Sequence, residues 1–415
     1  MTMRIFAASY VVPISSPPIT GGAVVVEEGR IAYVGPLDRL RSEYPGEVKE
    51  FPGCVIMPGL VNAHSHLELT HFPSWKLRKG IDYSPRTYVD WIIQIIKIRR
   101  ALTRAELEHS VMEGIRVSLE CGTTSIGEIV SDRSLIPLYE TTPISGRLYL
   151  EAIGQDPVRT GALLEELENT LNSFTNGRFR PGISPHAPHT LSTGFLKSLT
   201  ELADRHSIPA AIHLSESKEE ESFMADSTGK IADLLYPFAD WNNYIPPPRR
   251  TTSAAFLEGL GVLTPRTSVV HCVHVSPDDV QIIRRCGVSA ILCPRSNERL
   301  AVGKAPAVLL KKCGVPLALG TDSLASNDSL SLWDEMRFLI NEFPTVFSPQ
   351  EVLEMATIGS AKALKLDGEV GSLEKGKRAD FLVVQPARAV PHEGLAEVLI
   401  DESRLLEVYI NGNPV

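Results

Sequence analysis

The segment MPGLVNAHSH, from Met57 to His66, joins an apolar run to two histidines that lie two residues apart. In an extended strand, side chains two residues apart point to the same face. The imidazoles of His64 and His66 can therefore converge on one divalent ion. Histidine pairs of this kind are as often structural as metal-binding, so the ends of other strands have to decide between the two interpretations.

Outward from this segment, short apolar runs alternate with helical stretches. The apolar runs that we expect to form strands are residues 55–62, 123–130, 144–152, 179–184, 209–214, 267–273, 288–293 and 315–321. Some intervening helices have clear caps, since Ser276 and Ser348 are each followed by proline at the first helical position. This alternation predicts an α/β protein with a (β/α)8 TIM barrel rather than a doubly wound sheet.

Both ends of the chain have a different pattern, in which short strands are joined by tight turns. The strand-like segments at the ends are residues 4–12, 22–27, 30–34, 381–384 and 406–410. The simplest arrangement is a small β-sandwich domain made from residues 1–56 and 367–415, beside a barrel made from residues 57–366.

Composition restricts the partners of this chain. Among 415 residues, 41 Lys and Arg stand against 50 Asp and Glu, which gives a formal net charge of −9. Such a balance offers no attraction to a nucleic-acid polymer or an anionic membrane. No apolar run reaches the roughly 18 residues of a membrane span, and six cysteines without a CxxC pair are typical of reduced thiols. We expect a cytoplasmic protein with a small-molecule partner.

The ends of the later strands supply further candidate ligands. His213 closes the strand at 209–214, His271 lies near the end of the next strand, and Asp322 follows the last one. The carboxyl ends of parallel barrel strands meet at one rim. Several histidines and one carboxylate at that rim predict a mixed nitrogen and oxygen site suited to zinc or ferrous iron.

These residues, in this order, resemble the amidohydrolase superfamily. The segment from Gly371 to Asp380 is also similar to a tail of that family. The contexts HLSE at His213, SPHAP at His186 and GTDS at Asp322 are similar to its branch of nucleoside and purine-type deaminases, which includes S-adenosylhomocysteine and aminodeoxyfutalosine deaminases.

The resemblance implies one divalent ion, zinc or iron, held by His64, His66, His213 and Asp322. The two-metal branch uses a carbamylated lysine, and this chain has no lysine between residues 172 and 195. The resemblance further implies that Glu216 protonates a ring nitrogen of the substrate, while His271 and Asp322 handle the proton of the attacking water. On its own residues, Glu216 could instead be a solvated acid at a helix start, which is our expectation for Glu219, Glu220 and Glu221.

Other residues are expected to contact the substrate. His186 resembles a substrate-contacting histidine of the nucleoside deaminases, although His189 stands where the family often has tyrosine. Asn297 is either a residue of the substrate rim or a plain turn residue. Arg86 and Arg295 are the arginines best placed to meet a substrate carboxylate.

The remaining histidines are expected to be structural or exposed; they are His71, His109, His206, His274 and His392. Residues 217–265 form a long connection, which predicts a functional loop or a contact in a homo-oligomer.

The resemblance predicts hydrolytic deamination of a 6-aminopurine nucleoside derivative with release of ammonia. Aminodeoxyfutalosine, an adenine nucleoside that carries a benzoate and belongs to menaquinone synthesis, is the first expectation, because residues 85–91 resemble that group. The alternatives are S-adenosylhomocysteine or methylthioadenosine, or the hydrolysis of a guanine, cytosine or chlorotriazine-type ring. A binding protein that kept the barrel and lost turnover is the alternative from another class.

Overall fold

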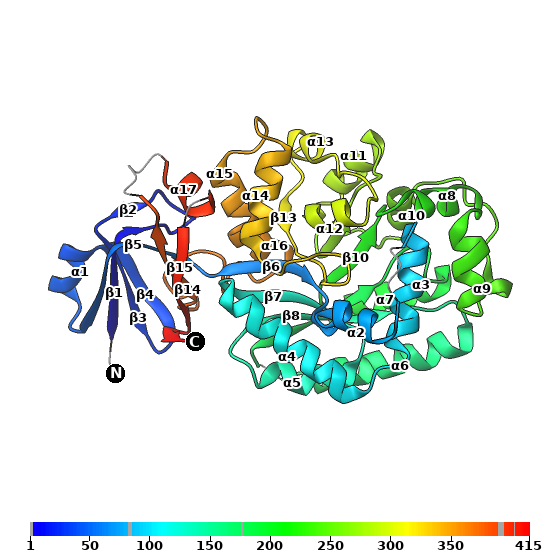
Figure 1. The fold of residues 1–415 in the computed structure, drawn as a ribbon, viewed down its shortest axis with the longest axis horizontal. Helices are drawn as coiled ribbons and strands as arrows, with labels where there is room; N and C mark the ends of the chain where they lie inside the picture. The colour runs from blue at the N-terminus through cyan, green and yellow to red at the C-terminus, as the bar shows by residue number, and fades with distance from the viewer. Residues whose placement is uncertain (1–2, 82–84, 176, 389–393, 402) are drawn as a thin grey trace.

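The computed structural model describes residues 3–81, 85–175, 177–388, 394–401 and 403–415. Two eight-stranded sheets organise the chain: a parallel sheet that curls into a barrel and a mixed sheet made from both ends of the chain (Figure 1). No helix in the described part of the chain is long and apolar enough to cross a membrane.

The barrel strands are hydrogen-bonded in sequence order from β6 to β13. Their bounds are β6 Leu60–Ser65, β7 Thr123–Val130, β8 Ser145–Ala152, β9 Phe179–Pro185, β10 Ala210–Leu214, β11 Thr267–His271, β12 Ser289–Leu292 and β13 Leu317–Leu319. A parallel bridge between Ser65 and Asp322 joins the end of β6 to the segment after β13. The sheet is therefore nearly closed, and the predicted (β/α)8 barrel is confirmed.

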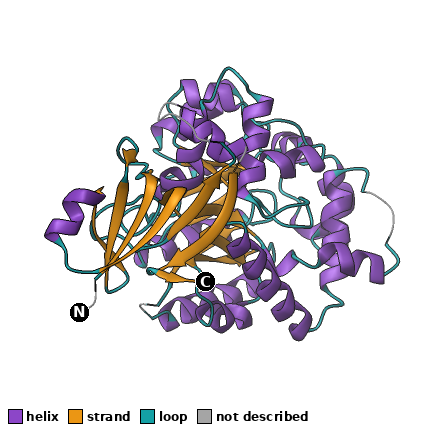
Figure 2. Cartoon of the chain, turned by 60° about the vertical axis from the view of Figure 1, so that its left-hand side comes forward, coloured by secondary structure: helices purple, strands orange, loops and turns teal. Residues whose placement is uncertain are grey.

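Helices surround the barrel on its outer face (Figure 2). From β6 to β10 they are η1 Leu67–Leu69, α2 Phe72–Arg78, α3 Tyr88–Arg99, α4 Arg104–Glu120, η2 Arg133–Leu135, α5 Ile136–Glu140, α6 Pro157–Ser173 and α7 Thr193–Arg205. After β10 come α8 Lys218–Asp226, η3 Ile231–Leu235, α9 Tyr236–Phe238, η4 Asn242–Tyr244 and α10 Ser253–Gly259. The rest are α11 Pro277–Arg285, α12 Pro294–Arg299, α13 Ala307–Lys312, α14 Leu332–Glu342, α15 Pro349–Glu354, η5 Met355–Gly359 and α16 Ser360–Ala363.

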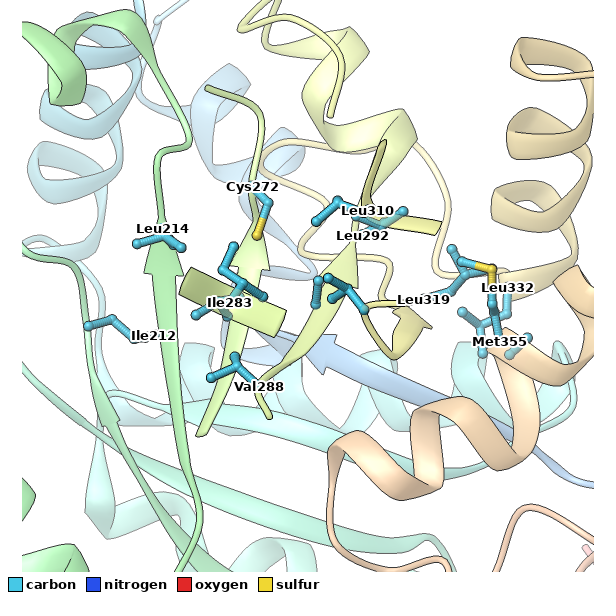
Figure 3. Packing of buried hydrophobic residues seen from close by; sticks show 14 of the residues in the cluster. Ile212, Leu214, Cys272, Ile283, Val288, Leu292, Leu310, Leu319, Leu332 and Met355 are labelled. Carbon is cyan, nitrogen blue, oxygen red and sulfur yellow. The ribbon is translucent and has the colours of Figure 1, made fainter. Parts of the chain in front are cut away.

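Period-two alternation separates the packing face of each barrel strand from its interior face. On β10, Ile212 and Leu214 point outward to the helical layer, where Ile283 of α11 belongs to the same apolar cluster (Figure 3). His213 lies between them and therefore points into the barrel. The predicted caps are also confirmed, because Ser276 and Ser348 both form capping boxes at the starts of α11 and α15.

The terminal strands form one continuous sheet beside the barrel (Figure 1). Its elements are β1 Arg4–Val11, β2 Ile19–Thr20, β3 Gly22–Glu27, β4 Arg30–Pro36, β5 Glu47–Pro58, β14 Phe381–Pro386, β15 Ser403–Ile410 and β16 Asn413–Pro414, with α1 Leu37–Glu43 and α17 Leu395–Asp401 attached. The rings of Phe381 and Tyr409 stack with centroids 4.5 Å apart, and both contact Phe6 at 5.0 Å. The two ends of the chain thus share one apolar core.

The prediction of one strand over residues 55–62 is wrong. β5 belongs to the terminal sheet as far as Pro58, and β6 begins in the barrel at Leu60. Gly59 lies between them, where a Cβ atom would stand 2.0 Å from Oγ1 of Thr124. Glycine is needed here because the side chain of Thr124 fills the space that a Cβ atom would take. The strand of the terminal sheet therefore extends past residue 56, where we placed the end of that domain.

Two segments outside the regular barrel pack together. The helix α3 contributes Tyr88 and Trp91 to an apolar cluster, and the long connection after β10 contributes Ile231, Leu235 and Tyr236 to it. Since α3 follows β6 and the connection follows β10, both lie at the carboxyl ends of the strands. This is the side on which barrels carry their sites.

A substitution of Gly146 in β8 tests how closely β7 and β8 pack. Its φ is +148°, and a Cβ atom there would stand 1.9 Å from the carbonyl oxygen of Ile126. We expect Gly146→Ala to lower the free energy of unfolding by about 3 kcal/mol or more, the scale of overpacking combined with backbone strain.

The matched control is Gly161→Ala. Gly161 lies inside α6, and nothing stands within 4 Å of the position that its Cβ atom would take. This change should stabilise the protein by up to about 1 kcal/mol through helix propensity. Chemical denaturation of both variants checks the pair, and equal stability of the two would contradict the packing argument.

Candidate functional site

The polar residues predicted to carry the chemistry meet at the carboxyl ends of the barrel strands. His64 lies in β6 and His66 directly follows it, His213 lies in β10, and His271 ends β11. Asp322 follows β13, where its backbone N–H donates to the carbonyl of His64 at 3.0 Å. The structure thus brings together all four predicted metal ligands and His271.

The backbone is strained where these side chains turn inward. The φ angles of His271 and Asp322 are 71° and 59°, in the left-handed region. Such conformations cost a non-glycine residue roughly 1–3 kcal/mol and persist where the surroundings hold them. The strain therefore marks two turns that are fixed to aim a side chain.

The imidazole nitrogens of His64, His66 and His213 fit a shared metal ion. One ligand atom from each of the three rings lies within 4.8 Å of the others. The Nε2 atoms of His64 and His66 are 3.2 Å apart, and Oδ1 of Asp322 lies 3.8 and 3.7 Å from them. Ligand atoms around a tetrahedral zinc ion, at about 2.0–2.1 Å from it, stand about 3.3 Å apart.

The protonation of these rings also suits metal binding. Burial lowers the pKa of His64 well below its ordinary value and lowers the pKa of His66 and His213 to about 4. Nδ1 of His213 donates to the carbonyl of His186 at 2.8 Å, which leaves the Nε2 lone pair free. Neutral imidazoles with free lone pairs are the form that binds a divalent ion.

Asp322 is held as a carboxylate. Burial by itself would raise its pKa, but His66, His271 and two hydroxyl groups keep the pKa below the ordinary value. Those hydroxyls belong to Ser296 and Ser326, and each donates to Oδ2 at 2.7 Å. Oδ1 is left facing the histidine cluster, as a ligand oxygen should be.

Glu216 lies beside the cluster and is 3% exposed, so it is not the solvated acid of the alternative interpretation. Burial raises its pKa to about 7. Its Oε2 accepts from the hydroxyl of Tyr88 at 2.8 Å, and its Oε1 lies 3.7 Å from Nε2 of His271. A carboxyl whose pKa is near neutrality can give and take a proton there. Tyr88 lies in the stretch 85–91 that resembles the aminodeoxyfutalosine group, but no sequence pattern predicted its contact with Glu216.

Asn297 is placed behind His271. Its Oδ1 accepts from Nδ1 of His271 at 2.9 Å, and Asn297 does not line the cavity described next. The structure shows Asn297 in contact with this ring, and its contact with substrate stays a prediction. Nε2 of His271 then carries the lone pair and faces Glu216.

A cavity of about 750 Å³ opens above these residues. His186, Glu216, His271 and Asp322 line its floor. The wall is largely apolar and comes from α3, α6 and the long connection; it includes Trp91, Ile92, Ile95, Ile96, Leu163, Leu235 and Trp241. The cavity therefore combines a polar floor with an apolar wall, as small-molecule sites do.

The arginines at this cavity differ from those predicted. Arg86 and Arg295 do not line it, and Arg295 is instead paired with Asp328. The guanidinium groups that line it are those of Arg99, Arg100, Arg133 and Arg159. Arg99 and Arg133 are paired with Glu68 and Glu166. Within the described ranges, no ion pair is formed by Arg100 or Arg159.

The prediction for Glu220 is wrong. We expected it to be solvated, like Glu219 and Glu221, but it is 1% exposed. It accepts from the backbone N–H groups of Ser215 and Glu216. Three adjacent acids in a first helical turn look alike in the sequence, and the packing of α10 against α8 decides which one is buried.

The other histidines mostly follow the prediction. His274 donates to the carbonyl of Val302 at 2.7 Å, and the rings of His71 and His109 stack on each other at 4.9 Å. His189 is buried near Glu220, with 3.9 Å between Nδ1 and Oε2. His392 lies outside the described residues.

Comparisons with known proteins agree with this geometry. A model described as the amidohydrolase family matches residues 55–415, and a model of a bacterial imidazolonepropionase-like composite domain matches residues 22–46. The chain belongs to the amidohydrolase family.

Deaminases are among its most similar relatives. The 5-methylthioadenosine/S-adenosylhomocysteine deaminase of Desulforudis audaxviator is 30% identical over 411 residues, covering 95% of this chain and 89% of that protein. The aminodeoxyfutalosine deaminase of Deinococcus radiodurans is 29% identical over 367 residues, covering 86% and 84%. A crystal structure of an adenosine deaminase from Xanthomonas campestris with bound zinc has a TM-score of 0.79 and 25% identity, covering 99% and 92%. Within its family, this chain is a hydrolytic deaminase.

The ligand set can be tested by metal analysis. Because His64, His66, His213 and Asp322 surround one point, we expect about one divalent ion per chain in metal-reconstituted protein. His64→Ala should lose the ion, and chelation of the wild type should lower Tm, because ligand binding to the folded state stabilises it. Elemental analysis and thermal unfolding measure both effects, and two ions per chain would contradict a mononuclear site.

Proposed function

We propose that this protein hydrolytically deaminates the 6-aminopurine group of a nucleoside derivative, with zinc as the bound ion and aminodeoxyfutalosine as the substrate. The observation that carries the proposal is Glu216, whose Oε1 lies 3.7 Å from Nε2 of His271 on the floor of a cavity of about 750 Å³. Its buried carboxyl faces the place where a ring nitrogen has to be protonated.

The reaction needs protons at two places. Water adds to the carbon that bears the amine, a proton goes to the adjacent ring nitrogen, and ammonia leaves after the amine has also been protonated. Glu216, whose pKa is raised to about 7 by burial, is the group that supplies the proton to the ring nitrogen. A divalent ion on His64, His66, His213 and Asp322 supplies Lewis acidity, which makes a water molecule more acidic.

His271 and Asp322 handle the proton of the attacking water. Asn297 holds the Nδ1–H of His271, so its Nε2 is free to accept a proton and later return it to the leaving amine. Burial keeps the pKa of His271 below its ordinary value, which favours the neutral ring that this step requires. The floor of the cavity therefore contains an acid, Glu216, and a base, His271, 3.7 Å apart.

The apolar wall of the cavity favours a substrate that carries an aromatic ring. Trp91, Ile92 and Ile96 of α3 face the cavity, and Leu163 and Trp241 complete an apolar wall. Apolar burial of a benzene ring is favourable at such a wall.

Two guanidinium groups at the same cavity could meet the carboxylate of that substrate. Arg100 and Arg159 line the cavity. Arg100 lies over the ring of Phe238, 5.1 Å from its centroid, and Arg159 interacts electrostatically with Asp156. A guanidinium binds a carboxylate with two parallel hydrogen bonds. A benzoate therefore finds both an apolar wall and a cationic partner here.

The second candidate substrate is S-adenosylhomocysteine, as the name of the Desulforudis relative suggests. Its ammonium group would need a carboxylate. Glu151 and Asp156 line the cavity, and Asp156 already caps α6 and accepts from the hydroxyl of Tyr244 at 2.7 Å. Glu151 is then the group that favours this alternative.

We also propose that the enzyme works in the cytoplasm. The support is chemical: all six cysteines are free thiols, and three of them are buried. Free thiols persist in a reducing compartment.

Glu216→Gln separates proton transfer from metal binding. The amide cannot donate a proton as a carboxylic acid does, so we expect kcat for adenosine or aminodeoxyfutalosine to fall by about a hundred-fold or more. His271→Asn should do the same. Both variants should keep their metal, because neither residue is a proposed ligand. Steady-state kinetics with metal analysis tests this, and near-normal turnover of Glu216→Gln would remove Glu216 from the mechanism.

Arg159→Met tests the substrate. If Arg159 meets the substrate carboxylate, KM for aminodeoxyfutalosine should rise by roughly tens of fold, the scale of a lost charge-assisted hydrogen bond, while kcat/KM for adenosine changes little. Arg100→Met is the second variant of the same kind. The matched control is Arg86→Met, because Arg86 is exposed and outside the cavity. Faster turnover of S-adenosylhomocysteine than of aminodeoxyfutalosine by the wild type would favour the alternative.

A further inference from the structure

Glu128 is a fully buried glutamate behind the first two histidines. It lies in β7, at 0% exposure. Its Oε2 accepts from the hydroxyl of Ser65 at 2.6 Å, and its Oε1 accepts from the backbone N–H of Leu67 at 2.7 Å. Oε1 also accepts from the hydroxyl of Tyr139 at 2.8 Å. One carboxylate thus holds both neighbours of His66.

Glu220 makes an equivalent set of contacts on the other side of the barrel mouth. Its Oε1 accepts from the backbone N–H of Ser215 at 2.8 Å and from the hydroxyl of Ser253. Its Oε2 accepts from the backbone N–H of Glu216 at 3.2 Å. The φ of Ser215 is 51°, so this turn is strained and needs its surroundings to hold it.

Neither glutamate lines the cavity, so neither touches the substrate. Their contacts are instead to the two turns from which site residues project. A carboxylate can accept several hydrogen bonds at once and donates none, whereas an amide side chain accepts at one end only. A buried N–H that loses its acceptor costs about 1–3 kcal/mol, so each turn would rearrange without its glutamate.

We propose that Glu128 and Glu220 are positioning residues with separate tasks: Glu128 fixes the turn that aims His64 and His66 at the metal, and Glu220 fixes the turn that aims Glu216 at the substrate. The task of Glu220 rests on the proposed function, because it acts through Glu216. The task of Glu128 rests only on the metal site.

The contacts of Glu128 predict a difference between two substitutions. In Glu128→Gln, the amide oxygen can still accept from Leu67 and Tyr139, and the amide nitrogen can donate to the hydroxyl oxygen of Ser65. Glu128→Met has a similar length and satisfies none of these groups. We expect zinc affinity to fall by about 10- to 100-fold in Glu128→Met, the scale of lost support for a metal ligand, and to stay within a few-fold of wild type in Glu128→Gln.

Competition of apo-protein with a chromophoric zinc chelator measures these affinities without any assay of activity. Circular dichroism and Tm of the metal-free variants show that they are folded. Should Glu128→Met not fold, Ser65→Ala removes one of the three contacts and should weaken zinc binding by a smaller factor in the same direction. Unchanged zinc affinity in Glu128→Met, or in Ser65→Ala where only that variant folds, overturns the role of Glu128.

Glu220→Gln should lower kcat and leave zinc affinity unchanged, which is the reverse of the effect expected for Glu128→Met. Both carboxylate oxygens of Glu220 accept from backbone N–H groups, so an amide must leave one of them facing another donor. We expect kcat to fall by about 10- to 100-fold, with KM and zinc affinity near the wild-type values. A fall in zinc affinity as large as that in Glu128→Met, or an unchanged kcat, overturns the role of Glu220. If the wild type deaminates no aminopurine nucleoside, the proposed function fails while the zinc measurements on Glu128 still stand.

Asp380→Asn is the matched control. Asp380 is also a buried carboxylate, 5% exposed, and accepts from the backbone N–H of Asn411 at 2.8 Å in the terminal sheet. Its substitution should lower Tm and leave zinc affinity and kcat unchanged. If Asp380→Asn weakens zinc binding as much as Glu128→Met does, the effect is general destabilisation and the proposal is wrong.

Discussion

Neutral imidazoles with their lone pairs aimed at one point govern the structure around the barrel mouth. A buried ring nitrogen costs free energy unless it has a partner of its own. His213 therefore donates its Nδ1–H to the carbonyl of His186, and His271 donates to Asn297. His186 follows β9 and Asn297 follows β12, so these two hydrogen bonds also fix the ends of different strands relative to each other.

Carboxylates accept further hydrogen bonds around the site. Asp322 accepts from two serine hydroxyls, while Glu128 and Glu220 accept from backbone N–H groups beside His66 and Glu216. Burial raises the pKa of Glu128 and Glu220, and the hydrogen bonds that both groups accept oppose that rise. A glutamate suits such a position because it can saturate several donors at once. Glu128 and Glu220 therefore support the site from outside the cavity, whereas Asp322 lines it.

Local spacing in the sequence was sufficient to predict the barrel and to bring the proposed ligand set together. Period-two spacing locates His64 and His66 on one face of a strand and separates His213 from its apolar neighbours. The rim of the barrel then brings residues from distant strands together without further information.

The break at Gly59 was missed because apolar residues continue on both sides of it, and only the approach of Thr124 shows that the strand must change sheets. The roles of Tyr88 and Glu128 were missed because these residues act across the fold, on partners that no spacing rule connects to them. Glu220 contacts residues close to it in the chain, but the sequence does not show which of three adjacent acids is buried. The prediction that Arg295 lines the cavity is wrong for a similar reason. Arg295 follows a barrel strand, as expected of a residue at the barrel rim. Its guanidinium group pairs with Asp328, in the segment after β13, and with Glu335 of α14, and both lie outside the cavity.

In the proposed function, chemistry and substrate choice are carried by different parts of this chain. The proposed metal ligands, Glu216 and His271 lie at or just after strand ends, where the closed sheet allows little change. The apolar wall comes from α3, α6 and the long connection after β10, which are attached to the barrel without being part of its sheet. Changes in the length or sequence of these segments alter the wall while the strand ends keep their geometry. A family whose members share the floor of the cavity can thus differ in the group that the wall receives, and this is why strand-end motifs define the reaction more closely than the substrate.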